Sequence, residues 1–313
     1  MSRTISLPPE ARRVLISQNP KAGAKSGNLA VEQLAQALAA QELQVDVLSD
    51  IDEIAERADE YLQEGELRCV VAAGGDGTIA LVANRTPEQA PLTVLPLGTE
   101  NLLAKHLSIG CDPAEVCRTI CQGEAERFDA GRAGERLFLL MVGCGFDADV
   151  VRRLHADRTG HIHHLSYAKP ILDSICNYEY PELTLECTIE TEQMTESRVE
   201  TISARWAFVA NLPRYAGGLQ IAPGASGHDG LLDVCTFKEG SLWNGLRYLS
   251  GVLLGQHESW EDCVATRATR VRIDAAGEAP YQLDGDPGGM LPVDIEVLPE
   301  RLTLLVPATN ETH

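Results

Sequence analysis

The chain has 313 residues, of which 44% are hydrophobic and 23% charged, a composition typical of a folded protein long enough for two domains. Its formal net charge of −20 argues against nucleic-acid binding, because nucleic-acid-binding proteins present a basic face to the phosphates. No uncharged apolar run reaches the roughly 18 residues of a membrane span, and residues 1–18 lack the apolar centre of a secretory signal. We therefore expect a cytoplasmic protein without a transmembrane segment.

Strand and helix patterns alternate along the first 130 or so residues. Short apolar strands are predicted at 14–17, 45–48, 69–73 and 91–95, and helical spacing follows each of them, at 29–38, at 51–62, at 78–84 and from about Glu100. Such alternation predicts parallel strands joined by right-handed helical crossovers. We therefore predict a doubly wound α/β domain over residues 1–133, whose ligands bind where strands end and helices begin.

The remainder of the chain is rich in strand patterns. Apolar and β-branched stretches occur at 137–142, 183–191, 201–211, 231–237, 270–274 and 293–306, with helical patterns near 164–178 and 242–254. These stretches predict an antiparallel β-sandwich domain over residues 134–299. We expect the tail, from about residue 300 to 313, to return to the first domain.

A glycine-rich block follows the third predicted strand. Residues 69–73 run directly into Gly74, Gly75, Asp76, Gly77 and Thr78. Glycine lets a backbone turn sharply and approach a phosphate closely, and a helix start offers free N–H donors to that anion. Thr78 could cap the helix or bind a phosphate oxygen, whereas Asp76 suggests that Mg²⁺ or water separates it from the phosphates. An ordinary β-to-α turn is the alternative interpretation.

Two further loops of similar design follow other strands of the same predicted sheet. The first lies at 95–101 and contains Gly98, Thr99 and Asn101, and the second begins at Asn19 and extends to Gly27. The second loop does not match the P-loop pattern, and a plain flexible loop would explain it almost as well. Loops at successive strand ends are expected to share one surface.

These three loops, in their order and spacing, resemble the diacylglycerol kinase catalytic-domain family. The resemblance continues through residues 128–129, 143–148, 217–218, 223–225, 229–234 and 283–286, and so covers nearly the whole chain. The 74–78 block alone is shared with nicotinamide-nucleotide kinases and phosphofructokinases, but the 96–101 and 229–234 blocks are more specific. The resemblance implies a similar two-domain fold with a nucleotide cleft between the domains.

The implied activity is that of an ATP-dependent lipid kinase. Such an enzyme transfers the γ-phosphoryl group of ATP to a hydroxyl of a diacylglycerol-, phosphatidylglycerol- or sphingoid-like lipid at a membrane surface. The expected partners are therefore ATP, Mg²⁺ and a lipid met during transient membrane association, and a homodimer is left open.

The resemblance also implies roles for particular residues. It assigns general-base catalysis to Asp286, with Asp284 as the competitor, although Asp-Gly is also a common hairpin turn. A structural Mg²⁺ would be held by the Asp229 carboxylate and the carbonyls of Ser226 and Leu231, with a solvated loop as the equally weighted alternative. Asp76 and Asp129 are assigned to the Mg²⁺–phosphate network. The residues assigned to cofactor binding as a whole are Asn19, Ser49, Gly74, Gly75, Asp76, Gly77, Thr78, Gly98, Thr99, Asn101 and Asp129.

The chain departs from the family pattern at several positions. Ala80 and Leu81 stand where polar helix residues are usual, Leu102 replaces an aspartate, and Asp286 is one methylene shorter than the usual glutamate. A base displaced by about 1 Å can cost ~100-fold in rate, so a nucleotide- or lipid-binding module with little turnover is one alternative function. A kinase for a soluble nucleotide such as NAD is another.

Two other features invite different interpretations. Residues 152–164 form a cationic island that could face lipid phosphates, although a solvated helix is favoured, and a zinc site at His161, His163 and His164 is disfavoured. Residues 143–148 match a GxGxxA dinucleotide fingerprint. We discount it because the sequence that follows is predicted to be β-rich, without the βαβ unit that the fingerprint requires.

Overall fold

The computed structural model describes residues 4–18, 25–156, 178–190 and 197–308. The chain divides into two compact units. Unit 1 comprises residues 1–128 and 300–313, and unit 2 comprises residues 129–299. None of the helices in the described ranges has the length and apolar character that crossing a bilayer requires.

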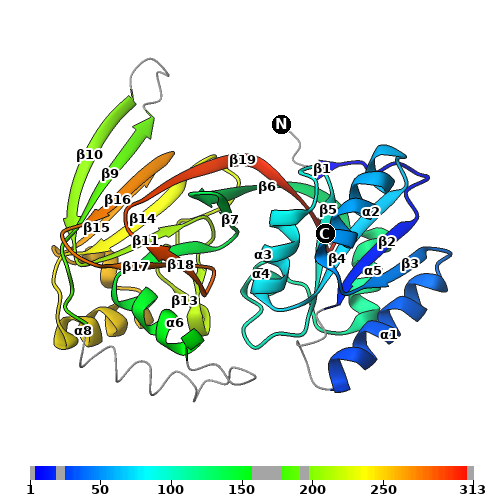
Figure 1. The fold of residues 1–313 in the computed structure, drawn as a ribbon, viewed down its shortest axis with the longest axis horizontal. Helices are drawn as coiled ribbons and strands as arrows, with labels where there is room; N and C mark the ends of the chain where they lie inside the picture. The colour runs from blue at the N-terminus through cyan, green and yellow to red at the C-terminus, as the bar shows by residue number, and fades with distance from the viewer. Residues whose placement is uncertain (1–3, 19–24, 157–177, 191–196, 309–313) are drawn as a thin grey trace, which may run out of the picture. The chain divides into compact units, whose positions relative to one another are not determined.

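Unit 1 is built on a parallel sheet whose strands lie in the order β3, β2, β4, β5 and the end of β19 (Figure 1). The register places Gln18 opposite Ala73, and Gly74 opposite Pro96, so the carboxyl ends of the strands meet at one edge. Helix α1 packs beside α5, and α2 beside α3. The elements are β1 (Thr4–Ile5), β2 (Arg13–Gln18), α1 (Lys25–Ala39), β3 (Gln44–Leu48), α2 (Ile51–Gln63), β4 (Leu67–Gly74), α3 (Asp76–Arg85), β5 (Pro91–Pro96), α4 (Leu102–His106), α5 (Pro113–Gln122) and β19 (Val293–Val306).

Sequence signals explain where these helices begin. The Asp50 carboxylate accepts hydrogen bonds from the first backbone N–H groups of α2, and Asp112 caps α5, which has proline at its first position. Both arrangements satisfy donors that a helix start leaves without partners. The central strands β2 and β4 are buried almost throughout, as parallel strands covered on both faces must be.

Unit 2 is an antiparallel sandwich. One sheet has the order β10, β9, β16 and β19, and the other has the order β15, β14, β11, β8, β17 and β18. Side chains such as Leu185 and Ile273 from the first sheet pack against Val209 and Val234 from the second. The elements are β6 (Glu124–Ala133), β7 (Arg136–Phe138), β8 (Met141–Cys144), α6 (Phe146–Ala156), β9 (Leu183–Glu190), β10 (Ser197–Ala204), β11 (Trp206–Ala210), β12 (Arg214–Tyr215), β13 (Leu219–Gln220), β14 (Leu232–Phe237), α8 (Leu242–Leu253), β15 (Cys263–Ala268), β16 (Arg270–Ala275), β17 (Pro280–Leu283) and β18 (Asp286–Met290).

Some elements differ from the sequence-based expectations. The strand predicted at 137–142 is interrupted between β7 and β8, because the backbone N–H groups there donate to a carboxylate from a distant hairpin. The strand predicted at 201–211 is two strands, β10 and β11, which belong to different sheets. Helix α6 follows β8, where the sequence predicted β structure. The helix expected at 164–178 lies outside the described residues but for its last position.

Candidate functional site

The two glycine-rich loops of unit 1 touch each other. They follow the neighbouring strands β4 and β5, and the backbone N–H of Leu97 donates to the carbonyl of Gly74 at 2.9 Å. A Cβ atom added to Gly98 would lie only 2.5 Å from the Cα of Gly75. Non-bonded carbon atoms in contact lie about 3.5 to 4.0 Å apart, so the close approach of the two loops requires glycine at position 98.

Asn101 and Asp76 fix the shape of these loops. The Asn101 side chain accepts a hydrogen bond from the Gly98 N–H and donates one to the Gly98 carbonyl, both at 2.9 Å. The two carboxylate oxygens of Asp76 accept the backbone N–H groups of Leu102 and Leu103, each at 3.0 Å, and so cap α4. Burial raises the pKa of Asp76 above its ordinary value, although these two hydrogen bonds lower it.

The other predicted nucleotide ligands of unit 1 lie near the same sheet edge. The Thr78 hydroxyl, in the first turn of α3, lies against Gly74, and the Thr78 N–H donates to the Gly75 carbonyl at 2.9 Å. Ser49 follows β3, and both Ser49 and Thr99 are exposed. Asn19 lies outside the described residues. The parallel register therefore brings the 74–78 and 98–101 loops and Ser49 to one edge.

Asp129 belongs to unit 2 and is buried there. Its Oδ2 accepts the Gly230 N–H at 2.8 Å, and its backbone N–H donates to the Gly227 carbonyl at 2.8 Å. Asp129 thus fastens the loop at 226–231, which contains the predicted Mg²⁺ ligands. Its participation in a phosphate network with Asp76 stays a prediction.

The three predicted Mg²⁺ ligands lie in this loop, and two of them, the Ser226 carbonyl and the Asp229 carboxylate, have other partners. The Ser226 carbonyl lies 3.0 Å from His228 Nδ1. Asp229 pairs with Arg267, at 3.5 Å between Oδ2 and Nη2, and its Oδ1 accepts the Leu231 N–H at 3.2 Å. Hard cations need several oxygens directed at one point, whereas the Asp229 carboxylate is here directed at Arg267 and at the Leu231 N–H. The metal site stays a prediction.

The two candidate bases lie in the hairpin between β17 and β18. Asp284 and Gly285, with φ of 51° and 88°, form its two-residue turn, as the Asp-Gly signal predicts. The Asp284 carboxylate accepts three backbone N–H groups, from Leu139, Leu140 and Met141, at 2.7 to 2.9 Å. The Asp286 side chain, in contrast, is 43% exposed and lies 3.5 Å from His155 Nε2 of α6. Of the pair, Asp284 thus has its carboxylate held by backbone N–H groups, whereas Asp286 has its carboxylate beside a side chain.

An apolar cavity of about 340 Å³ lies within unit 2 and reaches Gly285 of this hairpin. Its size falls in the range of small-molecule sites, and its walls are mainly aromatic and aliphatic. They come from α6, β11, β14 and α8, and include Val150, Trp206, Phe208, Phe237, Leu246 and Leu249.

One polar pair, Asp147 and Gln282, lines this cavity. Gln282 donates to Asp147 Oδ2 at 3.1 Å and accepts the Gly285 N–H at 2.7 Å, so it links the carboxyl to the hairpin. Burial raises the pKa of Asp147 to about 7. A Cβ atom on Gly143 would lie 2.2 Å from Asp147 Oδ2. The glycine of the 143–148 motif therefore makes room for this pair.

The 143–148 motif does not form a dinucleotide-binding unit, but the reason differs from the β-rich continuation that the sequence predicted. A helix does follow β8, contrary to the prediction. However, β8 pairs antiparallel with both of its neighbours, β11 and β17, so the parallel βαβ unit is not formed here. Sequence reasoning also missed Asp147, Gln282 and the contact of His155 with Asp286. The only signal for Asp147 was its place in the motif.

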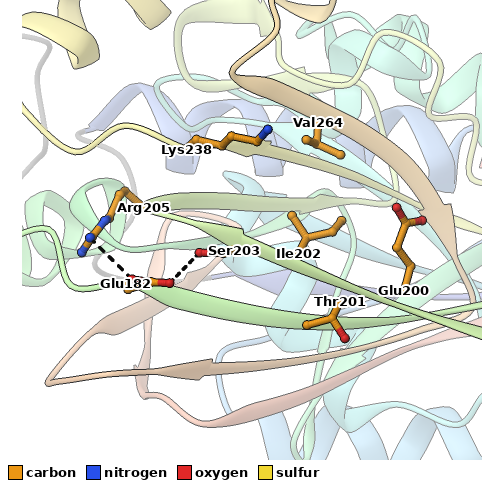
Figure 2. A pocket seen from close by; sticks show the side chains of 8 residues that line it. All are labelled: Glu182, Glu200, Thr201, Ile202, Ser203, Arg205, Lys238 and Val264. Carbon is orange, nitrogen blue, oxygen red and sulfur yellow. Dashed lines mark hydrogen bonds and ion pairs between the residues drawn. The ribbon is translucent and has the colours of Figure 1, made fainter.

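A second cavity and the cationic island contain none of the residues predicted for catalysis or nucleotide binding. The second cavity, of about 400 Å³, lies beside β10 and is shown in Figure 2. There Glu182 accepts the Ser203 hydroxyl and pairs with Arg205, and the residues predicted for the site lie elsewhere. In the cationic island, Arg152 and Arg153 both bind the buried Asp149 at 2.6 Å. The three histidines of the island, which were disfavoured as a zinc site, lie outside the described residues.

Comparisons with known proteins agree with this architecture. Residues 13–133 match the family model "Diacylglycerol kinase catalytic domain", and residues 140–306 match "YegS C-terminal NAD kinase beta sandwich-like domain". The chain is 26% identical over 247 residues to the "Diacylglycerol kinase" of Bacillus subtilis (strain 168), covering 77% of this chain and 78% of the relative. It is 29% identical over 305 residues to a "Probable lipid kinase YegS-like" of Pseudomonas aeruginosa, covering 94% of each.

Solved structures show the same fold. A crystal structure of a candidate diacylglycerol kinase from Bacillus anthracis str. Sterne superposes with a TM-score of 0.72 at 21% identity, covering 96% of this chain and 97% of that one. An α/β domain followed by a β-sandwich, as predicted from the sequence, is therefore confirmed.

Proposed function

Because the chain belongs to the diacylglycerol kinase catalytic-domain family, we propose that it is an ATP-dependent lipid kinase whose acceptor lipid occupies the apolar cavity of unit 2. Similarity to named lipid kinases supports the kinase activity. The observation that carries the proposed acceptor is the cavity itself. It has apolar walls suited to acyl chains and extends to Gly285, the neighbour of Asp286.

The loops of unit 1 are proposed to bind the triphosphate of ATP. Glycines at 75 and 98 let the two loops meet at one sheet edge, and α3 presents N–H groups at its start without a side-chain cap. Each Asp76 oxygen accepts one N–H and retains a lone pair, so Asp76 fits a role with Mg²⁺ in neutralising the phosphates. Thr78, Ser49 and Thr99 would add hydroxyl contacts.

Asp286 is proposed as the general base. As the lipid hydroxyl oxygen attacks the γ-phosphorus, its proton passes to the Asp286 carboxylate, the bond to the β–γ bridging oxygen breaks, and ADP leaves. Asp284 is disfavoured for this role because its carboxylate already accepts three backbone N–H groups. It holds the turn that presents Asp286.

Kinase activity is tested by following the γ-phosphoryl group. The purified full chain is incubated with Mg²⁺, γ-labelled ATP and either diacylglycerol, phosphatidylglycerol, sphingosine or NAD, and the organic and aqueous phases are counted. We expect label in the organic phase for at least one lipid. We also expect Asp286→Asn to lose activity by about 100-fold or more, in line with the contribution of a positioned base.

Asp274→Asn is the matched control, because Asp274 is an exposed aspartate of unit 2 on β16. Label on NAD alone would instead identify a soluble-nucleotide kinase. ATP binding without transfer to any acceptor would identify a nucleotide-binding module that has lost turnover. Full activity in the Asp286→Asn protein would refute the role proposed for Asp286.

A further inference from the structure

Helix α8, which Figure 1 shows in unit 2, packs through one of its faces. Tyr248 is buried and stacks on Phe237, with ring centroids 4.3 Å apart. Gly245 and Gly251 lie against the indole rings of Trp206 and Trp260, where a Cβ atom would come within 3.0 and 2.4 Å. The helix is therefore held firmly and in a fixed orientation.

The outward face of the same helix is also apolar. Trp243 is 77% exposed, Leu253 65% and Leu254, just beyond the last turn, 68%. Trp243, Leu246, Leu249 and Leu253 follow the three- and four-residue spacing that places side chains on one helical face, and Leu254 adjoins them. These five residues, here called the α8 strip, make up half of the ten large apolar side chains exposed in the described ranges. Contiguous exposed apolar surface of this kind marks an interaction site.

The α8 strip is continuous with the apolar cavity. Leu246 and Leu249 are about half exposed and also line the cavity. One helix thus provides both a wall of the cavity and the exposed surface beside it. A lipid that passes between a bilayer and the cavity could keep its acyl chains on apolar side chains throughout.

The charge of α8 fits an uncharged apolar partner. The helix contains no acidic residue, although the whole chain carries a net charge of −20. Its single charged side chain, Arg247, binds Asp262 at 2.6 and 3.0 Å and lies over the Trp260 ring. Tryptophan is also the side chain that favours the membrane interface. At 12 residues the helix is far too short to span a bilayer, so contact would be made by lying in the interface.

We propose that the α8 strip is the surface through which this protein docks on a lipid bilayer. The proposal rests on the lipid-kinase function proposed above, because that function requires a lipid to leave a membrane and enter the cavity. A second copy of the chain is a less suitable occupant. Stable dimers bury about 800 Å² on each partner, whereas the strip is one helix wide.

The test is binding to vesicles of neutral phosphatidylcholine, at low salt and in about 0.5 M NaCl, where charge attraction is screened. The double variant Trp243→Gln, Leu253→Gln changes the strip without touching the cavity lining. Its control, Leu81→Gln with Val199→Gln, changes two exposed apolar side chains elsewhere. We expect the strip variant to bind at least about tenfold more weakly, because two apolar side chains no longer enter the bilayer. Binding of the unchanged protein should resist salt.

Two further readouts separate the outcomes. Trp206 is buried and Trp260 is half-buried, so a shift of the fluorescence to shorter wavelength on vesicles would come mainly from Trp243. Phosphorylation of a lipid embedded in vesicles should fall in the strip variant, whereas phosphorylation of a dispersed short-chain lipid should not. If the strip variant bound vesicles as well as the unchanged protein does, the proposal would be overturned. The proposal would also be overturned if the unchanged protein were a dimer and the strip variant were a monomer that still bound vesicles. Strip-dependent binding without phosphorylation of any lipid would support docking and refute the kinase proposal.

Discussion

Asp284 and Asp286 lie two residues apart, yet their surroundings give them different tasks. The Asp284 carboxylate accepts three backbone N–H groups, whereas that of Asp286 is 43% exposed. A donor deprived of its partner costs about 1 to 3 kcal/mol when buried. We therefore expect Asp284→Gly, which suits the positive φ of this position, to lower the free energy of unfolding by about 3 kcal/mol in urea denaturation.

Asp286→Asn provides the comparison at the same turn. An exposed substitution of this kind changes stability by about 0.5 kcal/mol or less, so this variant should unfold like the original chain. Equal stability losses for the two variants would contradict the division of tasks between structure and chemistry. So would full stability in the Asp284→Gly protein.

Asp147 should make stability depend on pH. Its pKa is raised to about 7 in the folded protein, against about 3.9 in an unfolded chain. Between these values the folded state holds a proton that the unfolded state has lost. The stability that the protonated form provides is therefore complete below about pH 4 and is lost as the pH rises through about 7.

The substitution Asp147→Asn removes the ionisable group but keeps an oxygen for the Gln282 amide. The variant should therefore gain stability relative to the original chain as the pH rises from about 4 to about 8, by up to about 4 kcal/mol, with water in the cavity reducing the gain. Thermal unfolding at several pH values measures this difference. A difference that does not change with pH would show that Asp147 is ionised throughout.

At the scale of elements, the two glycine loops should tolerate no added methyl group where they touch. In Gly98→Ala, the new Cβ would lie 2.5 Å from Gly75 and 2.7 Å from Asn101 Oδ1, so the loops must move apart. We expect ATP affinity to fall at least about tenfold, as measured by calorimetry, because displacements of about 1 Å are costly at a binding site. Gly277→Ala, whose nearest neighbour would be 3.8 Å away, should bind ATP normally.

These loops were predictable because local residue types specify them. A strand followed by glycines identifies a phosphate-type loop without knowledge of the fold, and adjacent parallel strands then bring two such loops together. The acidic hairpin turn was predictable for the same reason. In contrast, the pairing of Gln282 with Asp147 joins residues 135 positions apart, and no local pattern encodes it.

The elements of unit 2 were harder to bound for a related reason. The apolar run at 201–211 predicts extended structure, but it does not reveal that Arg205 separates strands of two different sheets. The break between β7 and β8 depends on the Asp284 carboxylate, about 145 residues away in sequence. Strand existence follows from local residue patterns, whereas strand ends here follow from tertiary hydrogen bonds.

At the scale of the whole molecule, strand β19 serves both units. Its first part pairs with β16 in the sandwich, and its last part pairs with β5 in the parallel sheet of unit 1. Leu302, Leu304 and Leu305 of the last part are buried there. Burial of three leucines contributes roughly 5 to 9 kcal/mol, which is comparable to the whole stability of a typical domain.

A chain that ends at Pro299 should therefore lose folded unit 1 and keep folded unit 2. All three tryptophans, at positions 206, 243 and 260, belong to unit 2, so tryptophan fluorescence reports on that unit while ATP binding reports on unit 1. We expect the truncated chain to retain a cooperative fluorescence transition and to bind no ATP. A chain ending at Ala308 keeps all of β19 and should behave like the full chain in both measurements. If the chain ending at Pro299 still bound ATP, residues 300–306 would not be required for the nucleotide-binding unit, because its remaining four parallel strands would suffice.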